Sequence, residues 1–244
     1  NHLQLFKFAG SFIARALIEG VCIDAHFTSS FCKIILHRNP CLKDLEDFDE
    51  ELFNNLTWMY NNDVTCLDLY FETDCNHFGE YKTIPLKENG SNISLTNENK
   101  NEYIALKTKF ILVDQIKDQI DSFCSGFDEL IPHKYLRFFT PSELDLLICG
   151  VPTIDFEDFK NNFQFEPPFT SETPVVKLFF EAISHWENDD LAKLLKFITG
   201  SSRLPVNGFK EFIEMTGHPL QIAPGGDRDR LPVSHTCFNR LDLP

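Results

Sequence analysis

The sequence has few of the features that mark membrane, secreted or nucleic-acid-binding proteins. It contains no run of about 18 apolar residues, and its first residues lack the basic and then apolar pattern of a signal peptide. We therefore expect neither a membrane span nor a secretory leader. Basic residues are also scarce, because 22 Lys and Arg stand against 37 Asp and Glu, a net charge of −15. Such an acidic surface repels phosphate backbones, so we expect no nucleic acid among the partners.

Cysteines with metal-binding spacing are absent as well. None of the eight cysteines forms a C-x-x-C pair, which argues against a zinc ribbon. Cys66, Cys75 and His77 match no standard ligand spacing, so we expect no metal and no cofactor. The thiols are scattered and mostly flanked by apolar residues. This distribution favours a reducing compartment, the cytoplasm or the nucleus.

The 244 residues, of which 43% are apolar, suffice for one large domain or two smaller ones. Phe occurs 25 times and Met only twice, so rigid rings fill much of the core. Alternating residues predict a strand over 67–72, and Asn89-Gly90 predicts a type I′ turn between strands 81–87 and 92–95. Apolar spacing in the first half predicts helices over 2–20, 27–37, 49–60 and 99–125.

A helix start and a candidate hinge follow in the second half. Thr140-Pro141-Ser142-Glu143 combines a capping residue, a first-turn proline and a carboxylate, and so predicts a helix. Gly150-Val151-Pro152-Thr153 ends this helix and is either an interdomain hinge or an ordinary loop. Beyond it, we expect helices over 156–162, 175–186 and 191–199, and strands over 212–215, 220–223 and around Cys237. The pattern as a whole is that of an α+β protein.

The last stretch, residues 231–244, surrounds one cysteine with polar side chains between two Leu-Pro steps. Proline neither extends a helix nor donates to a central strand, so Pro232 and Pro244 bound a short strand or loop that presents Cys237. A free cysteine is more often a small buried hydrophobe than a nucleophile. The sequence by itself leaves both possibilities open.

The polar neighbours of this cysteine have two interpretations. His235 precedes Cys237 by two residues, which puts both side chains on one face of an extended strand. In that position His235 would tune or orient the thiol, while Thr236 and Asn239 would hold the loop. The alternative is that His235 and Asn239 are structural and satisfy backbone groups around the turn.

Residues 231–244 resemble the active-site signature of HECT-type ubiquitin ligases, Leu-Pro-x-x-His-Thr-Cys-Phe-Asn-x-Leu-x-Leu-Pro. In that family the cysteine carries ubiquitin as a thioester, which a substrate lysine then attacks. The resemblance assigns this role to Cys237 and implies no cofactor. It extends over essentially the whole chain, because four further segments look like family landmarks: 87–90, 96–100, 146–150 and 197–205.

The resemblance implies a bilobal α+β fold. A mostly helical larger lobe would span 1–150, with a β-hairpin-containing subdomain at about 63–123. A hinge would lie at 150–154, and a smaller mixed α/β lobe over 155–244 would carry Cys237. In such ligases the subdomain binds a ubiquitin-conjugating enzyme through an apolar groove, with plain core packing as the alternative role for its residues. By position, the groove candidates are Leu52, Leu56, Met59, Leu67, Leu69 and Tyr103.

The resemblance also suggests a HECT domain truncated at both ends. The helix over 2–20 is apolar on most sides, which is typical of a buried helix, and we expect preceding elements to cover it. The family continues past the signature and usually ends near a Phe that assists transfer to lysine, whereas this sequence ends at Pro244. We therefore expect ubiquitin, a conjugating enzyme and a protein substrate as partners, with the final transfer impaired.

Two other functional classes stay open at this point. One is a relative that binds the conjugating enzyme without chemistry. The other is a cysteine hydrolase that uses Cys237 and His235. The two-residue spacing of that pair and the lack of an identifiable oxyanion loop disfavour the hydrolase.

Overall fold

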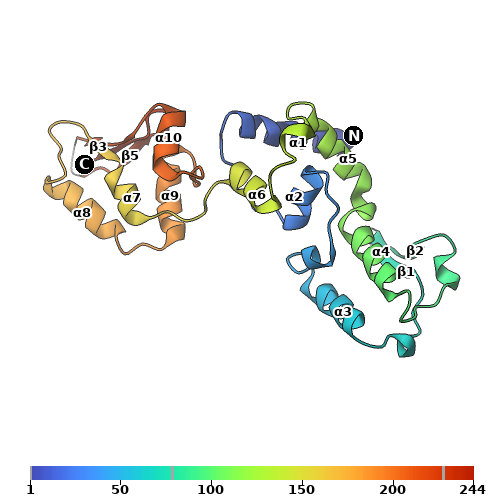
Figure 1. The fold of residues 1–244 in the computed structure, drawn as a ribbon. Helices are drawn as coiled ribbons and strands as arrows, with labels where there is room; N and C mark the ends of the chain where they lie inside the picture. Colours follow the sequence, from blue (N-terminus) through green and yellow to red (C-terminus); the bar gives the residue numbers. More distant parts are fainter. Residues whose placement is uncertain (1, 78–79, 227–228) are drawn as a thin grey trace. The chain divides into compact units, whose positions relative to one another are not determined.

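The computed structural model describes residues 2–77, 80–226 and 229–244 (Figure 1). The chain divides into two compact units, which we call the first unit (residues up to 14 and 27–142) and the second unit (15–26 and 143–244). No helix within the described ranges is long and apolar enough to span a bilayer.

The first unit is mostly helical. Thr28 accepts a hydrogen bond from Phe31 N at 3.3 Å and so caps the second helix, and Asp49 caps the third by accepting from Leu52 N at 2.9 Å. Its helices are α1 (His2–Ile18, which runs on into the second unit), α2 (Ser29–Ile35), α3 (Glu50–Asn61), α4 (Lys100–Leu112) and α5 (Lys117–Asp128). Shorter 3₁₀ turns are η1 (Leu42–Leu45), η2 (Thr65–Leu67), η3 (Gly90–Asn92), η4 (Asp114–Ile116) and η5 (His133–Tyr135).

Three predictions for this unit are wrong. The single helix over 99–125 is two helices, α4 and α5, because Val113 leaves helical geometry (φ −133°) and η4 follows. The strand over 67–72 is mostly irregular chain: Leu67 ends η2, Tyr70 forms an isolated bridge with Ser94, and only Glu72 belongs to a strand, of which it is the first residue. The hairpin is β1 (Glu72–His77) paired antiparallel with β2 (Glu80–Pro85), and its connecting residues lie outside the described ranges.

Asn89 does take the left-handed conformation that its sequence favours, with φ +58°. It leads into η3 instead of a hairpin, because Gly90 packs directly on the backbone of Phe71 and turns the chain there. Residues 92–95 then contribute only an isolated bridge, between Ser94 and Tyr70. The sequence thus predicted the left-handed conformation of Asn89 correctly but assigned it to a hairpin that does not form there.

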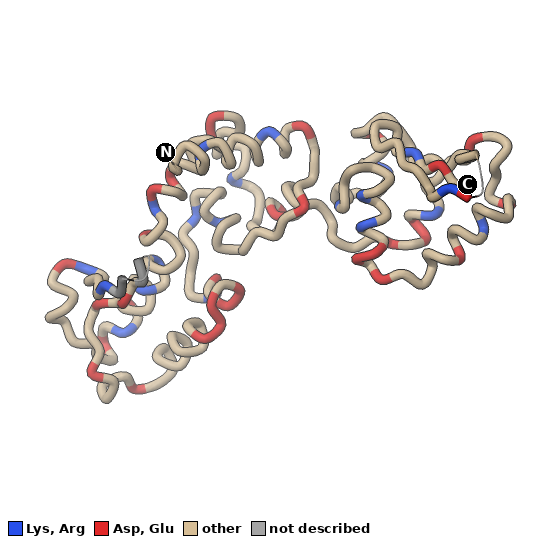
Figure 2. Tube along the Cα trace, turned by 180° about the vertical axis from the view of Figure 1, so that it is seen from behind, with Lys and Arg blue, Asp and Glu red and all other residues tan. Residues whose placement is uncertain are grey.

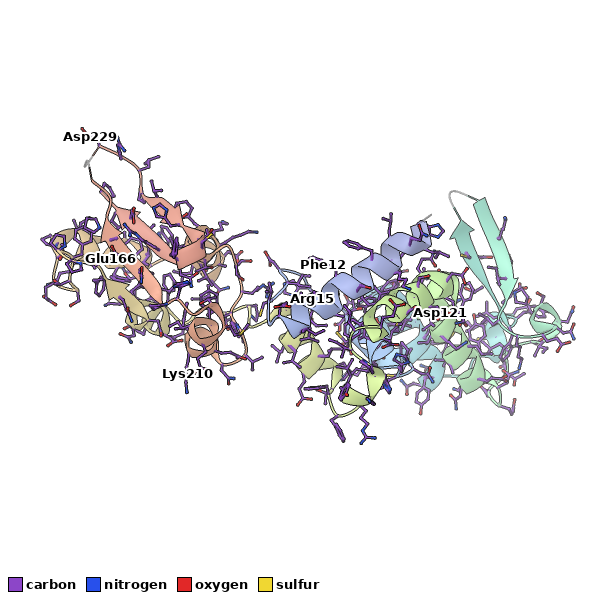
Figure 3. The ribbon with its side chains drawn as sticks, turned by 90° about the horizontal axis from the view of Figure 1, so that it is seen from above. Phe12, Arg15, Asp121, Glu166, Lys210 and Asp229 are labelled. Atoms are coloured by element: carbon purple, nitrogen blue, oxygen red, sulfur yellow. The ribbon has the colours of Figure 1, made fainter. Side chains whose placement is uncertain are left out.

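Two glycines let α1 and α5 approach closely. A Cβ on Gly10 would clash with the carbonyl oxygen of Phe123, and a Cβ on Gly126 would clash with that of Lys7. Ser11 Oγ donates to the carbonyl oxygen of Gly126 at 3.0 Å, across the same contact. The opposite side of α1 is uncovered: Phe12, labelled in Figure 3, is 56% exposed.

The second unit packs helices against a mixed sheet (Figure 1). Besides α6 (Pro141–Cys149), which begins at the predicted Pro141, its helices are α7 (Phe156–Asn161), α8 (Pro174–Ile183), α9 (Asn188–Thr199) and α10 (Gly208–Thr216). The strands are β3 (Phe163–Phe165), β4 (Leu220–Pro224), β5 (Val233–His235) and β6 (Arg240–Leu243), in the order β3-β4-β6-β5. Neighbouring strands are parallel except β5, which runs antiparallel to β6.

Helix starts and stops in this unit follow the sequence closely. Asp155 caps α7 by accepting from Asp158 N at 2.7 Å, and Gly200 ends α9 with φ +85°. The strand predicted over 212–215 is wrong, because these residues belong to α10. Phe209 and Phe212 are buried three residues apart, which is helical spacing.

Gly150 is also in the left-handed region, with φ +70°, and Val151 N donates to Leu204 O at 2.7 Å. The two units divide near residue 142, and residues 15–26 join the second. The lobes 1–150 and 155–244 stay a prediction. The joint at 150–154 stays a prediction.

We expect Gly126→Ala to lower the free energy of unfolding by about 1–3 kcal/mol, because the added methyl forces α1 and α5 apart. Urea unfolding followed by circular dichroism measures the change. Ser125→Ala, at an exposed position of the same helix, is the matched control and should stay within about 0.5 kcal/mol. Equal stability of the Gly126 variant and wild type would contradict the close packing.

Candidate functional site

Cys237 lies in the turn between an edge strand and its neighbour. β5 ends at His235, the 3₁₀ turn η6 (Thr236–Phe238) follows, and β6 begins at Arg240. The thiol is free and exposed. The turn is closed by Asn239, which has φ +50° and ψ 39°, a conformation that Asn tolerates better than most residues. The sulfur is therefore presented at the surface by a tight turn and not by a long loop.

Asn239 anchors this turn to the rest of the unit. Its side chain is nearly fully buried, and Nδ2 donates to His218 O at 2.8 Å and to Thr216 Oγ1 at 3.1 Å. Its own carbonyl oxygen accepts from Gln221 N at 2.9 Å. Asn239 thus ties the cysteine turn to the end of α10 and the start of β4. These contacts are compatible with both interpretations of Asn239, so its role at the site stays a prediction.

A chain of polar and charged contacts runs over one face of the sheet beside the turn. His235 Nε2 lies 3.1 Å from Asp242 Oδ2, and Arg240 Nε donates to Asp242 Oδ1 at 2.6 Å. Arg240 Nη1 also lies 3.2 Å from Glu166 Oε1, a residue labelled beside the sheet in Figure 3. The hydrogen bond to Asp242 holds the pKa of Arg240 above its usual value. Arg240 therefore stays charged and links the two carboxylates.

The alternation along β6 explains this arrangement. Leu241 and Leu243 are buried in the core, so Arg240 and Asp242 point to the opposite face of the sheet. The register sets Arg240 opposite His235 and Asp242 opposite Val233, so Asp242 is the diagonal neighbour of His235, two residue pairs away on the same face of the sheet.

The prediction that His235 and Cys237 share one face of an extended strand is wrong. The strand ends at His235 and the chain turns into η6, so the two-residue periodicity does not continue to Cys237. Within the described part of the chain, the hydrogen bond of His235 goes to Asp242 and none joins it to the sulfur. This geometry favours the structural interpretation of His235. A direct effect on the thiol stays a prediction.

Thr236, the first residue of the turn, lies next to Gly200 at the end of α9. A Cβ on Gly200 would stand 4.0 Å from Thr236 Cβ, and the carbonyl oxygen of Thr236 accepts from Asn239 N at 3.4 Å. On the other side of the cysteine, Phe238 makes an edge contact with His218, with ring centroids 5.6 Å apart. Several apolar side chains of the segment that carries Cys237 are exposed, namely Leu231, Val233 and Phe238.

The eight cysteines differ in how far their thiols are exposed to solvent. Desolvation raises the pKa of Cys124 to about 11 and also raises that of Cys22, so both thiols stay protonated near neutral pH. Three thiols are exposed: Cys41, Cys66 and Cys237. Of these, Cys237 is the one that the sequence places in a polar turn.

The six groove candidates all belong to one apolar cluster of the first unit. Leu56 and Tyr103 are only 1% and 2% exposed, and Tyr103 packs edge-on against Phe71 with centroids 5.5 Å apart. These two side chains are core residues in this conformation, so a partner would not reach them. The other four are half-buried at the rim of the cluster: Leu52, Met59, Leu67 and Leu69.

A family model described as HECT-domain (ubiquitin-transferase) matches residues 1–244. The chain belongs to the HECT family. The E3 ubiquitin-protein ligase pub1 of Schizosaccharomyces pombe is 42% identical to this HECT chain over 246 residues, which cover all of the chain and 32% of pub1. The E3 ubiquitin-protein ligase RSP5 of Saccharomyces cerevisiae is 40% identical over 246 residues, covering all of the chain and 30% of RSP5.

A third relative is the E3 ubiquitin-protein ligase TOM1-like of Neurospora crassa, which is 42% identical over 247 residues. The match again covers all of the HECT chain, but only 6% of that protein. The chain therefore spans a third or less of the length of these relatives.

Sequence reasoning missed several residues of the HECT cysteine turn. Arg240 and Asp242 occupy variable positions of the signature, yet strand alternation would have placed both on the face opposite Leu241 and Leu243. Glu166 and His218 lie far from the signature in sequence, and no local pattern connects them to it. These contacts depend on strand order and on the turn after α10.

We expect Asn239→Ala to lower the free energy of unfolding by about 2–4 kcal/mol. It removes two buried hydrogen bonds and places Ala in the left-handed region, which costs about 1–2 kcal/mol. Asn89→Ala is the matched control, since Asn89 is also left-handed but exposed, and it should lose about 1 kcal/mol. Equal losses, measured by urea unfolding, would show that the Asn239 amide does not anchor the turn.

Proposed function

We propose that this HECT chain accepts ubiquitin from a ubiquitin-conjugating enzyme as a thioester on Cys237 and passes it to a lysine of a protein substrate. The observation that carries the proposal is an exposed free thiol, presented by an anchored turn, at the cysteine of the HECT signature. An incoming ubiquitin is a folded protein with a flexible tail, so a buried sulfur would not serve. The names of the relatives, all E3 ubiquitin-protein ligases, support the same activity.

The chemistry needs two acyl transfers. In the first, the Cys237 thiolate attacks the carbonyl carbon of ubiquitin's terminal glycine, and the bond from that carbon to the sulfur of the conjugating enzyme breaks. One thioester replaces another, so the exchange requires no cofactor. In the second, an uncharged lysine amine attacks the same carbon, an amide bond forms, the Cys237 sulfur leaves, and the amine's proton passes to solvent.

The residues around Cys237 act mainly by holding the turn in position and less by transferring protons. Asn239 and Thr236 hold the turn, and Asp242 fixes the imidazole of His235 beside it. We infer that His235 acts on the thiol only through this orientation. The exposed apolar side chains Leu231, Val233 and Phe238 suit contact with the ubiquitin tail.

The conjugating enzyme would dock in the first unit. The half-buried rim of Leu52, Met59, Leu67 and Leu69 supplies apolar contact. The exposed acidic run over 46–51, just before and at the start of α3 and visible in Figure 2, would complement a basic partner surface. The docking site and the sulfur belong to different units, so we propose that a joint at 150–154 lets them come together. The eight free thiols fit a reducing compartment, the cytoplasm or the nucleus.

We expect wild-type protein mixed with ubiquitin-charged conjugating enzyme to form a ubiquitin adduct that is visible on a non-reducing gel and is lost on reduction. Cys237→Ala should abolish the adduct, because no other sulfur stands at the signature position. Cys66→Ser, which removes another exposed thiol, is the matched control and should form as much adduct as wild type.

The same gel distinguishes the competing functions. Release of free ubiquitin without an adduct would indicate a hydrolase, and neither adduct nor release would indicate a chain that only binds the conjugating enzyme. A reducible adduct that persists in Cys237→Ala would refute the nucleophile assignment.

We expect Met59→Ala and Leu67→Ala to slow adduct formation by about 5–30-fold, because truncating a contact at the centre of an interface costs about 1–2 kcal/mol. Labelling of Cys237 by iodoacetamide should not change, which separates lost docking from lost reactivity. Phe138→Ala, at a 76% exposed aromatic away from the rim, is the control and should charge normally. Unchanged charging of both rim variants would place the docking site elsewhere.

A further inference from the structure

The segment 19–26 lies early in the sequence but belongs to the second unit, whereas residue 27 already belongs to the first. It is mostly irregular chain, since α1 ends before it and α2 begins only at Ser29. Its backbone is attached to α6, because Ile23 N donates to Ile148 O at 2.8 Å. Side-chain contacts of Asp24 and His26 complete this attachment.

Both of these side chains bind Arg203, which follows α9. The guanidinium is buried, with the residue 9% exposed, so its N–H groups need partners within the protein. Nε donates to Asp24 Oδ1 at 3.2 Å, and Nη2 lies 2.8 Å from His26 Nε2. The backbone of Arg203 is held as well, because its carbonyl oxygen accepts from Ser201 Oγ at 3.0 Å. A fixed, buried cation thus holds the last residues of the segment.

The contact between Arg203 and His26 has only one possible direction. A guanidinium donates hydrogen bonds and has no acceptor, so His26 Nε2 must accept. An imidazole nitrogen accepts only when it carries no proton, and the proton of the neutral ring is then on Nδ1. A proton on Nε2 would set two N–H donors and two positive charges against each other at 2.8 Å. The bound segment therefore requires a neutral His26.

The carboxylate beside this contact does not offer a protonated His26 a replacement partner. Asp24 Oδ1 accepts from Arg203, and Oδ2 faces Lys196 Nζ of α9 at 3.8 Å, so two cations already share this carboxylate. Among the residues that the structure describes, no hydrogen bond joins Asp24 to His26. Protonation of His26 would thus remove its contact with Arg203 without creating another.

Charged groups on the other elements around the segment have partners of their own. These pairs are Glu19 with Arg15, which Figure 3 labels, Glu211 of α10 with Asn207 N, and Asp145 of α6 with Cys149 Sγ. Burial raises the pKa of the Cys22 thiol, so this thiol stays protonated. Within the described surroundings of the segment, His26 is therefore the side chain whose charge changes just below neutral pH.

We propose that His26 is a pH switch. Its neutral imidazole holds the segment 19–26 on Arg203, and its protonation releases the segment from the rest of the second unit. The sign follows from the direction of the hydrogen bond: the bound segment excludes a proton from Nε2 and the released segment does not. The released state binds more protons, so the attachment is strong above neutral pH and weakens as the pH falls.

The size of the effect follows from the same linkage. A solvated imidazole has a pKa of about 6.5, so at pH 5.5 its protonated form outnumbers its neutral form about tenfold. Because the bound segment excludes this proton, the equilibrium constant for release should rise about tenfold between pH 7.5 and pH 5.5.

The test measures amide hydrogen exchange of the whole chain by mass spectrometry at the two pH values. The amide of Ile23 is hydrogen-bonded to Ile148 and exchanges when the segment detaches. Dividing the intrinsic exchange rate at each pH by the observed rate gives a protection factor. We expect the protection factor of Ile23 to fall about tenfold from pH 7.5 to pH 5.5. A peptide from α8, whose Val176 and Phe180 lie in the core, should keep its protection.

Two variants assign the effect to one side chain. His26→Gln keeps an acceptor oxygen near the position of Nε2 but does not titrate, so the protection of Ile23 should become independent of pH. His185→Gln, at an exposed histidine of the same unit, is the matched control and should keep the tenfold fall of the wild type.

The wild type alone can refute the switch, because equal protection of Ile23 at both pH values would overturn the proposal whether or not a variant folds. A tenfold fall that persists in His26→Gln would overturn it too, since another group would then carry the pH dependence.

Discussion

The buried amide of Asn239 is the interaction on which the cysteine turn depends. One side chain closes the turn in a left-handed conformation and also bonds to the segment between α10 and β4. Asn is one of the few residues that combine tolerance of this conformation with a hydrogen-bonding amide. The sulfur two residues earlier is therefore exposed on a turn whose end is anchored, and the proposed acyl transfer requires that combination.

The two faces of the sheet around the turn differ, because one packs into the apolar core and the other carries charged side chains. Leu241 and Leu243 pack into the apolar core, while Arg240 and Asp242 form ion pairs on the other face. Partly exposed pairs of this kind contribute little to stability, typically below about 1 kcal/mol. Their effect is on geometry, because Asp242 holds the imidazole of His235, the residue directly before the cysteine turn.

The thiols of the chain differ in access. Cys237 stands exposed on a turn that a protein partner can reach. Burial instead raises the pKa of Cys22 and Cys124 and keeps both thiols protonated.

The sequence by itself determined the HECT membership, the α+β class, the signature cysteine and the local stops such as Asp155 and Gly200, because caps, turn residues and motifs act over a few residues. It did not determine the partner of β2, the break at Val113 or the helix over 208–216. Only the tertiary structure decided these, since close packing at Gly90 and burial of Phe209 and Phe212 overrode local propensity. The same holds for His235, whose partner depends on strand register, and for the burial of Leu56 and Tyr103, which depends on elements distant in sequence.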